Sequence, residues 1–180
     1  LLVQRERLAT EAAAPGARLN DADHLISQLE ERTMSTPISR RTLPARTVAS
    51  VRGIIPTYAD EGLLWQRLMV GLPAAGGRVA QQPLAVAAFH DEDYAEHDAD
   101  VEVQLDVAAP FADAADVQCV EVPTTEIASG MLHGPYDGVG AVMEDLGAWI
   151  TEHGQTIAGP MFNIYLVGPQ TTPDSSRWLT

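Results

Sequence analysis

The sequence predicts an α+β fold in which a β-α-β-β unit occurs twice around a pseudo-two-fold axis, preceded by a helical dimerisation arm. Three observations lead to this prediction. The hydrophobic period changes from helical to alternating near residue 36, strands and helices then follow in the same order twice, and the two halves match at an offset of 79 residues. At that offset Val-Ala-Ser at 48–50 falls on Ile-Ala-Ser at 127–129, and Pro56 falls on Pro135. Two halves related in this way enclose a cleft, and such clefts commonly bind small ligands.

Residues 1–35 predict the helical arm. Pro15-Gly16 interrupts the first helical run, and a second helix begins after the cap at Asn20-Asp21. One narrow apolar stripe runs along this second helix, formed by Ala22, Leu25, Ile26 and Leu29. A stripe this narrow has to be buried against a partner. We therefore expect a homodimer through the N-terminal helix, with a helix that folds onto its own domain as the alternative.

Residues 36–180 predict the main domain, and its elements can be justified in order. Alternation of apolar and polar residues indicates strands, helical spacing of leucines indicates helices, and Gly or Pro marks the turns. In the first half we expect strands at 38–43 and 46–52, a turn at 53–56, a helix at 59–72, and strands at 84–89 and 101–107. In the second half we expect strands at 117–122 and 126–133, a turn at 134–136, a helix at 138–153, and a strand at 161–167. Residues 177–180 have the pattern of a last strand that is truncated.

Composition narrows the classes of function. The chain has 180 residues, 46% of them hydrophobic, and a formal net charge of −14. Residues 42–180 carry all of this negative charge, and every basic residue is Arg. A surface this acidic repels phosphate, so we expect no nucleic-acid binding by this part of the protein. No apolar run approaches the roughly 18 residues of a membrane span, and a cytoplasmic protein is the default expectation.

Motifs for metal, cofactor and nucleophilic chemistry are missing from the sequence. The lone Cys119 forms no CxxC pair, and neither a GxSxG turn nor a phosphate-binding loop occurs. His90 and His97 flank a run of acidic residues, which suggests either a metal site or, as the favoured interpretation, a solvated acidic loop. We therefore predict no catalytic residues, no metal and no cofactor.

Three segments together resemble a known family. They are Leu-His-Gly-Pro-Tyr-Asp-Gly at 132–138, the helix that ends Trp-Ile-Thr-Glu-His-Gly at 149–154, and Gly-Pro-Met-Phe-Asn-Ile-Tyr-Leu-Val-Gly-Pro at 159–169. In this order they resemble the GyrI-like effector-binding domain, which shares its fold with SOUL-like proteins. Leu-Glu-Glu-Arg-Thr-Met at 29–34 resembles the end of the dimerisation helix in MerR-type transcription regulators that carry this domain.

The resemblance implies a binding site between the two β-α-β-β halves. In the family, small and often aromatic, cationic molecules bind there among aromatic rings and buried carboxylates. It implies ligand-binding roles for Tyr58, His133, Tyr136, Asn163, Tyr165 and Trp178, with Glu102 as a substitute anion. Asn163 and Tyr165 are two residues apart on a predicted strand, so both should point to the same face. The family commonly has Glu at the position of Asn163, and an amide cannot balance a buried cation.

The function that these observations favour is a small-molecule sensor domain of a MerR-type regulator, which would bind DNA only through an N-terminal domain that is absent here. Two alternatives remain. Some proteins of this fold are hydrolases that use a Tyr and the Glu at position 163, and Asn163 argues against this activity because the base is a carboxylate. The other alternative is a stand-alone module that sequesters a protein.

Overall fold

The computed structural model describes residues 37–114 and 116–180, so the predicted arm at 1–35 lies outside the described residues. The first half contains β1 (Ser39–Leu43), β2 (Arg46–Ile55), the 3-10 turn η1 (Tyr58–Asp60), α2 (Gly62–Ala74), β3 (Ala85–Phe89) and β4 (Ala99–Asp106). The second half contains β5 (Gln118–Val122), β6 (Thr125–Ser129), the 3-10 turn η2 (Tyr136–Gly138), α3 (Val139–Glu152), β7 (Met161–Tyr165) and the 3-10 turn η3 (Ser175–Arg177). The predicted α+β class with a repeated β-α-β-β order is confirmed.

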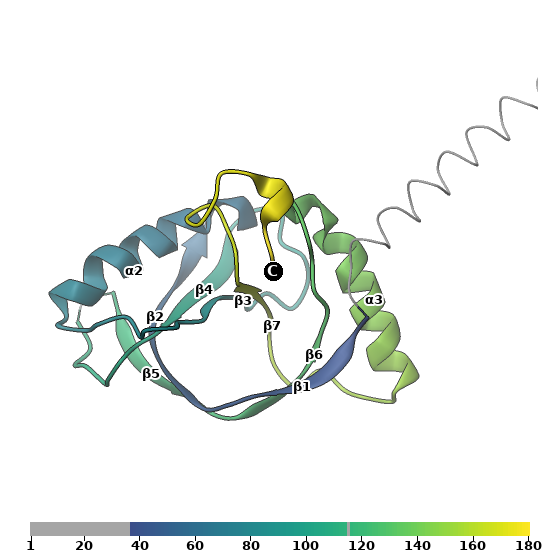
Figure 1. Ribbon diagram of the computed structural model, residues 1–180, viewed down its shortest axis with the longest axis horizontal. Helices are drawn as coiled ribbons and strands as arrows, with labels where there is room; N and C mark the ends of the chain where they lie inside the picture. Colours follow the sequence, from purple (N-terminus) through teal and green to yellow (C-terminus); the bar gives the residue numbers. More distant parts are fainter. Residues whose placement is uncertain (1–36, 115) are drawn as a thin grey trace, which may run out of the picture.

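The strands are all antiparallel and curl into a ring. Five of them follow the order β5-β2-β4-β3-β7, and β1 pairs with β6. The β1–β6 and β2–β5 ladders share one register, because partner numbers add to 168 in both. Pro44 lies between β1 and β2, and Pro123 lies between β5 and β6, at neighbouring positions of this register. A proline has no backbone N–H, so neither residue can donate a hydrogen bond to the ladder. The two ladders are therefore one ladder with a bend, which brings the ends of the sheet together (Figure 1).

The last residues occupy the place that the repeat predicts for them. Leu179 forms antiparallel bridges with both His133 and Val167. The backbone of Thr180 exchanges two hydrogen bonds with Leu132, of 2.8 and 3.1 Å. In the first half, β4 pairs in the same way with both β2 and β3. The predicted similarity of the two halves thus extends to the C-terminal segment, which crosses between α2 and α3 at the top of Figure 1.

The core lies between α2 and the five-stranded sheet. Leu64, Leu68 and Leu72 recur at helical spacing on one face of α2 and are each at most 1% exposed. They pack against the alternate residues of β2 and β4 that point to the same side, including Val51 and Val103. On α3, Val142 alone is buried. The first half therefore holds most of the buried apolar surface.

The main helix of the first half begins later than predicted. Tyr58–Asp60 form a separate 3-10 turn, and α2 starts at Gly62. The cause is local, because the Asp60 carboxylate accepts hydrogen bonds from the backbone amide and hydroxyl of Thr57, at 3.0 and 2.8 Å. Strand β2 also extends to Ile55, beyond the predicted turn.

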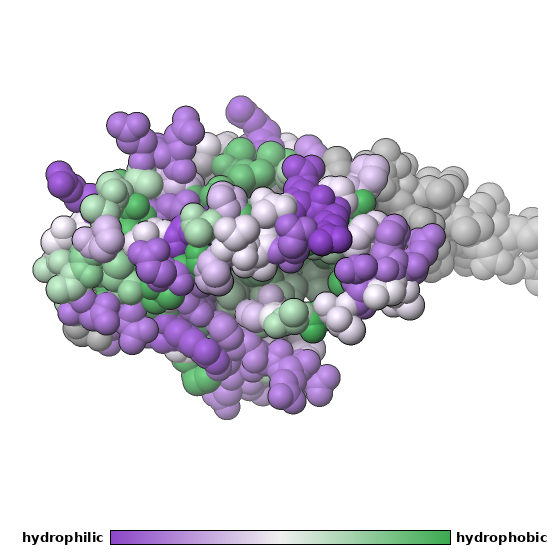
Figure 2. Space-filling model, turned by 90° about the horizontal axis from the view of Figure 1, so that it is seen from below, coloured by the Kyte–Doolittle hydropathy of each residue, from purple (hydrophilic) through white to green (hydrophobic). Residues whose placement is uncertain are grey.

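The surface is mostly hydrophilic, with apolar patches between the polar residues, as the view from below in Figure 2 shows. The most exposed large apolar side chains include Leu63, Met69 and Val70 of α2. Within the described residues, no helix combines the length and apolar character needed to cross a membrane.

Two helical glycines should respond to alanine in opposite directions. A Cβ at Gly71 would overlap Val117 Cγ2, and Val117 is buried and stiff, whereas nothing lies near a Cβ at Gly147. We expect Gly71→Ala to lower the free energy of unfolding by about 1–3 kcal/mol, and Gly147→Ala to raise it by up to about 1 kcal/mol. Urea denaturation checks both. A stabilised Gly71→Ala protein would contradict the packing described here.

Candidate ligand-binding site

Four aromatic side chains from both halves of the domain converge in an aromatic cluster, defined here as Trp65, Tyr136, Tyr165 and Trp178. The Tyr165 ring lies edge-on to Tyr136 at 5.7 Å between centroids and to Trp65 at 6.3 Å. Tyr136 in turn lies against Trp178 at 4.8 Å, with the rings tilted by 34°. These distances are typical of aromatic pairs that attract one another. The cluster joins α2, η2, β7 and the C-terminal segment.

Local backbone structure places the two rings of the second half. Gly134 has a φ of 104°, which favours glycine, and the extended Pro135 then directs the chain into the 3-10 turn that starts with Tyr136. The Gly134 amide donates to the Trp178 carbonyl at 3.0 Å, so the two segments are held together. The Trp178 indole N–H donates to the Thr172 carbonyl at 3.0 Å. Both rings are therefore positioned by hydrogen bonds as well as by packing.

Glu61 supplies a carboxylate to the aromatic cluster. It is the residue just before α2, and its Oε2 accepts a hydrogen bond of 2.9 Å from the Tyr165 hydroxyl. Trp65 lies one helical turn later on the same face of the helix. Burial raises the pKa of Glu61, and the polar hydrogens of Tyr165 and Trp65 only partly oppose the shift. Among the described residues, no arginine or histidine forms an ion pair with Glu61.

The tyrosine hydroxyls of the cluster are hydrogen-bond donors rather than anions. Burial raises the pKa of Tyr165, and the nearby charge of Glu61 raises it further. The same two causes, in the same order, raise the pKa of Tyr136. An ionised tyrosine beside a carboxylate would place two negative charges together in a poorly solvated site. The cluster therefore presents neutral rings, hydroxyl donors and one acidic group.

The structure brings four of the seven predicted binding residues together. Asn163 and Tyr165 point to the same face of β7, as predicted, and the Asn163 amide donates to the Tyr165 hydroxyl at 3.5 Å. Tyr136 and Trp178 complete the set through their ring contacts. Sequence reasoning missed Glu61. The useful signal was an acid at the start of α2 with Trp65 four residues later, which places both side chains on one helix face.

Tyr58 lies in a different set of contacts. Its ring packs against Phe89 and Tyr94, at 5.5 and 5.4 Å, and its hydroxyl donates to Asp91 at 2.9 Å. The amide of Ala95 donates to the same hydroxyl at 3.2 Å. Tyr58 thus holds the hydrophilic loop at 90–98 against the domain. His133 is exposed, and no described contact joins its side chain to the aromatic cluster.

Glu102 lies on the opposite face of the sheet from Tyr165. Successive residues of a strand alternate between faces, and the pairing of β4, β3 and β7 puts Glu102 beside Ala88 and Phe162 rather than beside Asn163. Its carboxylate accepts hydrogen bonds from Ser50 and Gln104 and lies 2.8 Å from His90 Nε2. Burial acts to raise the pKa of Glu102, but these partners outweigh it and hold the pKa below its usual value.

The acidic loop at 90–98, expected to be solvated, is tied to the domain at its first residues. The His90 ring nitrogen is engaged by Glu102, and Asp91 is occupied by Tyr58 and by the Asp100 amide. Within residues 37–114 and 116–180, no group of three or more His, Cys, Asp or Glu side chains is arranged to hold a metal ion.

Comparison with solved structures supports the fold. The EcmrR C-terminal domain aligns with a TM-score of 0.68 and 20% identity, over 79% of this chain and 91% of that chain. EcmrR in a cryo-EM complex with DNA aligns with a TM-score of 0.73 and 22% identity, over 98% of this chain and 68% of that chain. A hydrolase from Listeria innocua aligns with a TM-score of 0.56 and 15% identity, over 84% and 94%.

Comparison with sequences assigns the family. A search of curated proteins finds no match. The family described as the GyrI-like small molecule binding domain matches residues 36–179, which is most of the chain. The chain therefore belongs to the family of GyrI-like small-molecule-binding domains.

Proposed function

We propose that this domain binds an aromatic, cationic small molecule at the aromatic cluster and acts as the sensor of a MerR-type transcription regulator. The observation that carries the proposal is Glu61, a partly buried carboxylate with a raised pKa, no cationic partner among the described residues, and aromatic rings around it. A ligand cation would supply the missing partner. Its rings would pack on Tyr136, Tyr165 and Trp178.

The physics of the cluster favours a cation over an anion. A positive charge over an aromatic face gains about 0.5–2 kcal/mol, depending on how far it is desolvated. A carboxylate without a cationic partner in a poorly solvated site adds a direct Coulomb attraction. The formal net charge of −14 also attracts cations from a distance. An anion at the same place would meet Glu61 with no positive group to offset the repulsion. In this proposal Glu61, the residue just before α2, supplies the negative charge that the resemblance leads one to expect at position 163.

The proposed regulator couples the ligand to DNA through parts outside the described residues. The cluster takes Trp65 from the first half and Tyr136 and Tyr165 from the second, so a ligand there contacts both halves at once. A ligand that binds one relative arrangement of the halves more tightly shifts the population toward it. In the proposal, the arm at 1–35 forms the homodimer and an N-terminal domain contacts the promoter.

A small-molecule hydrolase is a second candidate, favoured by one specific contact. Asn163 cannot act as a base, but the Glu61 carboxylate lies 2.9 Å from the Tyr165 hydroxyl. Glu61 could accept a proton from water while Tyr165 donates to a leaving oxygen. Turnover of epoxide or ester substrates that disappears in Glu61→Gln would support this candidate over a pure sensor.

Removing the charge of Glu61 should weaken binding of cations selectively. The probe is 4-hydroxyphenyltrimethylammonium, and its neutral isostere is 4-tert-butylphenol. We expect Glu61→Gln to weaken binding of the cation by about 10- to 100-fold, because about 1.4–2.8 kcal/mol of charge interaction is lost. Binding of the neutral isostere should change by less than about threefold. Isothermal titration calorimetry measures both.

Two variants control for the overall charge and for the position of the acid. Glu152→Gln removes the same charge from an exposed position at the end of α3 and should leave both affinities unchanged. Glu61→Gln combined with Asn163→Glu returns one carboxylate to the cluster and should recover part of the lost affinity. Equal losses in Glu61→Gln and Glu152→Gln would sink the proposed site.

The affinity for this cation should depend on pH through Glu61. The probe has a quaternary nitrogen that does not titrate, so a change in charge at acidic pH comes from the protein. Because burial raises the pKa of free Glu61, affinity should be constant above that pKa and fall as the pH drops through it, by up to tenfold per unit. The Glu61→Gln protein should lack this fall. Titrations from pH 7.5 to 4.5 test it, and equal slopes in both proteins would contradict the assignment.

A further inference from the structure

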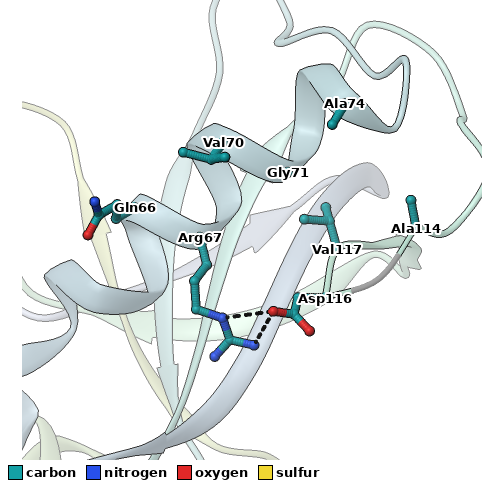
Figure 3. Close-up of a pocket in the computed structure, with 8 residues that line it drawn as sticks. All are labelled: Gln66, Arg67, Val70, Gly71, Ala74, Ala114, Asp116 and Val117. Atoms are coloured by element: carbon teal, nitrogen blue, oxygen red, sulfur yellow. Dashed lines mark hydrogen bonds and ion pairs between the residues drawn. The ribbon is translucent and has the colours of Figure 1, made fainter.

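Two adjoining hollows lie along α2 and the loop before β5, and none of their lining residues belongs to the aromatic cluster. One has a volume of about 360 Å³ and an apolar wall of Val70, Gly71, Ala74 and Val117 (Figure 3). The other has a volume of about 440 Å³ and is polar, with Ser50, Arg52 and Gln118 in its wall. Arg67 and Asp116 line both hollows, so the two hollows meet at this ion pair. Each volume is within the range of small-ligand sites.

The polar hollow has two guanidinium groups in its wall, each paired with one aspartate. Arg52 binds Asp100 through Nε and Nη2, at 2.9 and 2.7 Å. Arg67 binds one oxygen of Asp116 through Nε and Nη2, at 3.3 and 3.1 Å. These contacts leave Nη1 of each guanidinium without a hydrogen-bond partner among the described residues. Two donors in the wall of one hollow therefore remain available to an anion.

The ion pair between the hollows is easily exchanged. The side chains of Arg67 and Asp116 are 42% and 63% exposed. Figure 3 shows Nε and Nη2 of Arg67 directed at the same carboxylate oxygen of Asp116. Solvent-exposed pairs of this kind contribute little to stability. A carboxylate from a ligand can replace Asp116 at Arg67 without disturbing the core.

The apolar hollow is suited to a hydrocarbon chain. Gly71 and Val117 are closely packed, because a Cβ at Gly71 would overlap Val117 Cγ2, and together with Val70 and Ala74 they form a continuous apolar wall. Val70 at the rim is 70% exposed, so it has apolar surface to bury. An apolar wall directly beside two guanidinium groups matches a molecule with a hydrocarbon tail and an anionic head.

We propose that the two hollows form one binding site for amphipathic carboxylates, with the head at Arg52 and Arg67 and the tail over Gly71, Ala74 and Val117. The site is separate from the aromatic cluster and takes ligands of the opposite charge. It requires no movement of the sheet or of α2. Asp116 competes with the ligand for Arg67 and therefore limits its affinity.

Titration of the whole chain with octanoate tests this proposal, with calorimetry as the measurement. We expect octanoate to bind more tightly than three comparison compounds. Octan-1-ol lacks the negative charge, octyltrimethylammonium carries a positive charge in its place, and acetate lacks the hydrocarbon tail. Arg67→Gln should weaken octanoate binding by at least about fivefold, because it removes the central donor. Asp116→Asn should tighten it by about two- to fivefold, because it removes the competing acid.

Controls separate the site from general charge effects and from the aromatic cluster. Arg78→Gln removes an exposed arginine that lines neither hollow and should leave octanoate affinity unchanged. A saturating amount of 4-hydroxyphenyltrimethylammonium should not displace octanoate. The proposal is overturned if the parent protein does not bind octanoate, if octan-1-ol binds equally well, if Arg67→Gln and Arg78→Gln lose affinity equally, or if Asp116→Asn fails to tighten binding.

Discussion

The single ladder formed by β1–β2 and β5–β6 is the constraint on which the rest of the structure depends. Its register passes unchanged through the break at Pro44 and Pro123, so the two long strands bend together and the sheet curls. Because of this curl, the C-terminal residues reach a position between the strands of the second half, and Leu179 bridges both neighbours. The same curvature brings Tyr136 and Trp178 over β7. The aromatic cluster is therefore a consequence of strand pairing far from its rings.

The acidic group of the aromatic cluster comes from the start of α2 and not from β7. Asn163 lies on the strand where the resemblance leads one to expect a carboxylate, while Glu61 approaches the same tyrosine from the start of α2. The hydrogen bond from Tyr165 keeps the Glu61 carboxylate oriented toward the rings. Burial raises the pKa of Glu61 because it disfavours the charged carboxylate. Glu61 thus connects the aromatic cluster to α2, whose leucines at 64, 68 and 72 pack against the five-stranded sheet.

The acidic side chains of the described residues differ in how they are paired. On the face away from α2, acids are matched within the protein, as Glu102 is by Ser50, Gln104 and His90. At the aromatic cluster, Glu61 accepts a hydrogen bond from Tyr165 but has no cationic partner among residues 37–114 and 116–180. Along α2, Arg67 and Asp116 form an exposed pair between two hollows. Within the described part of the chain, Glu61 thus has no cationic partner, and Nη1 of Arg52 and of Arg67 has no acceptor.

The sequence by itself determined the local features of this protein. Hydrophobic spacing predicted the leucine stripe of α2, and alternation predicted β4, because each pattern depends on a single element. The offset of 79 residues revealed the duplicated unit because it compares the two halves of the sequence directly. Asn163 and Tyr165 were paired correctly because strand geometry alone puts them on one face. Only the tertiary structure brought Glu61 to Tyr165 and assigned Glu102 to the opposite face of the sheet. Those two results depend on which strands are neighbours and on how α2 crosses them, and no pattern within a single element encodes either.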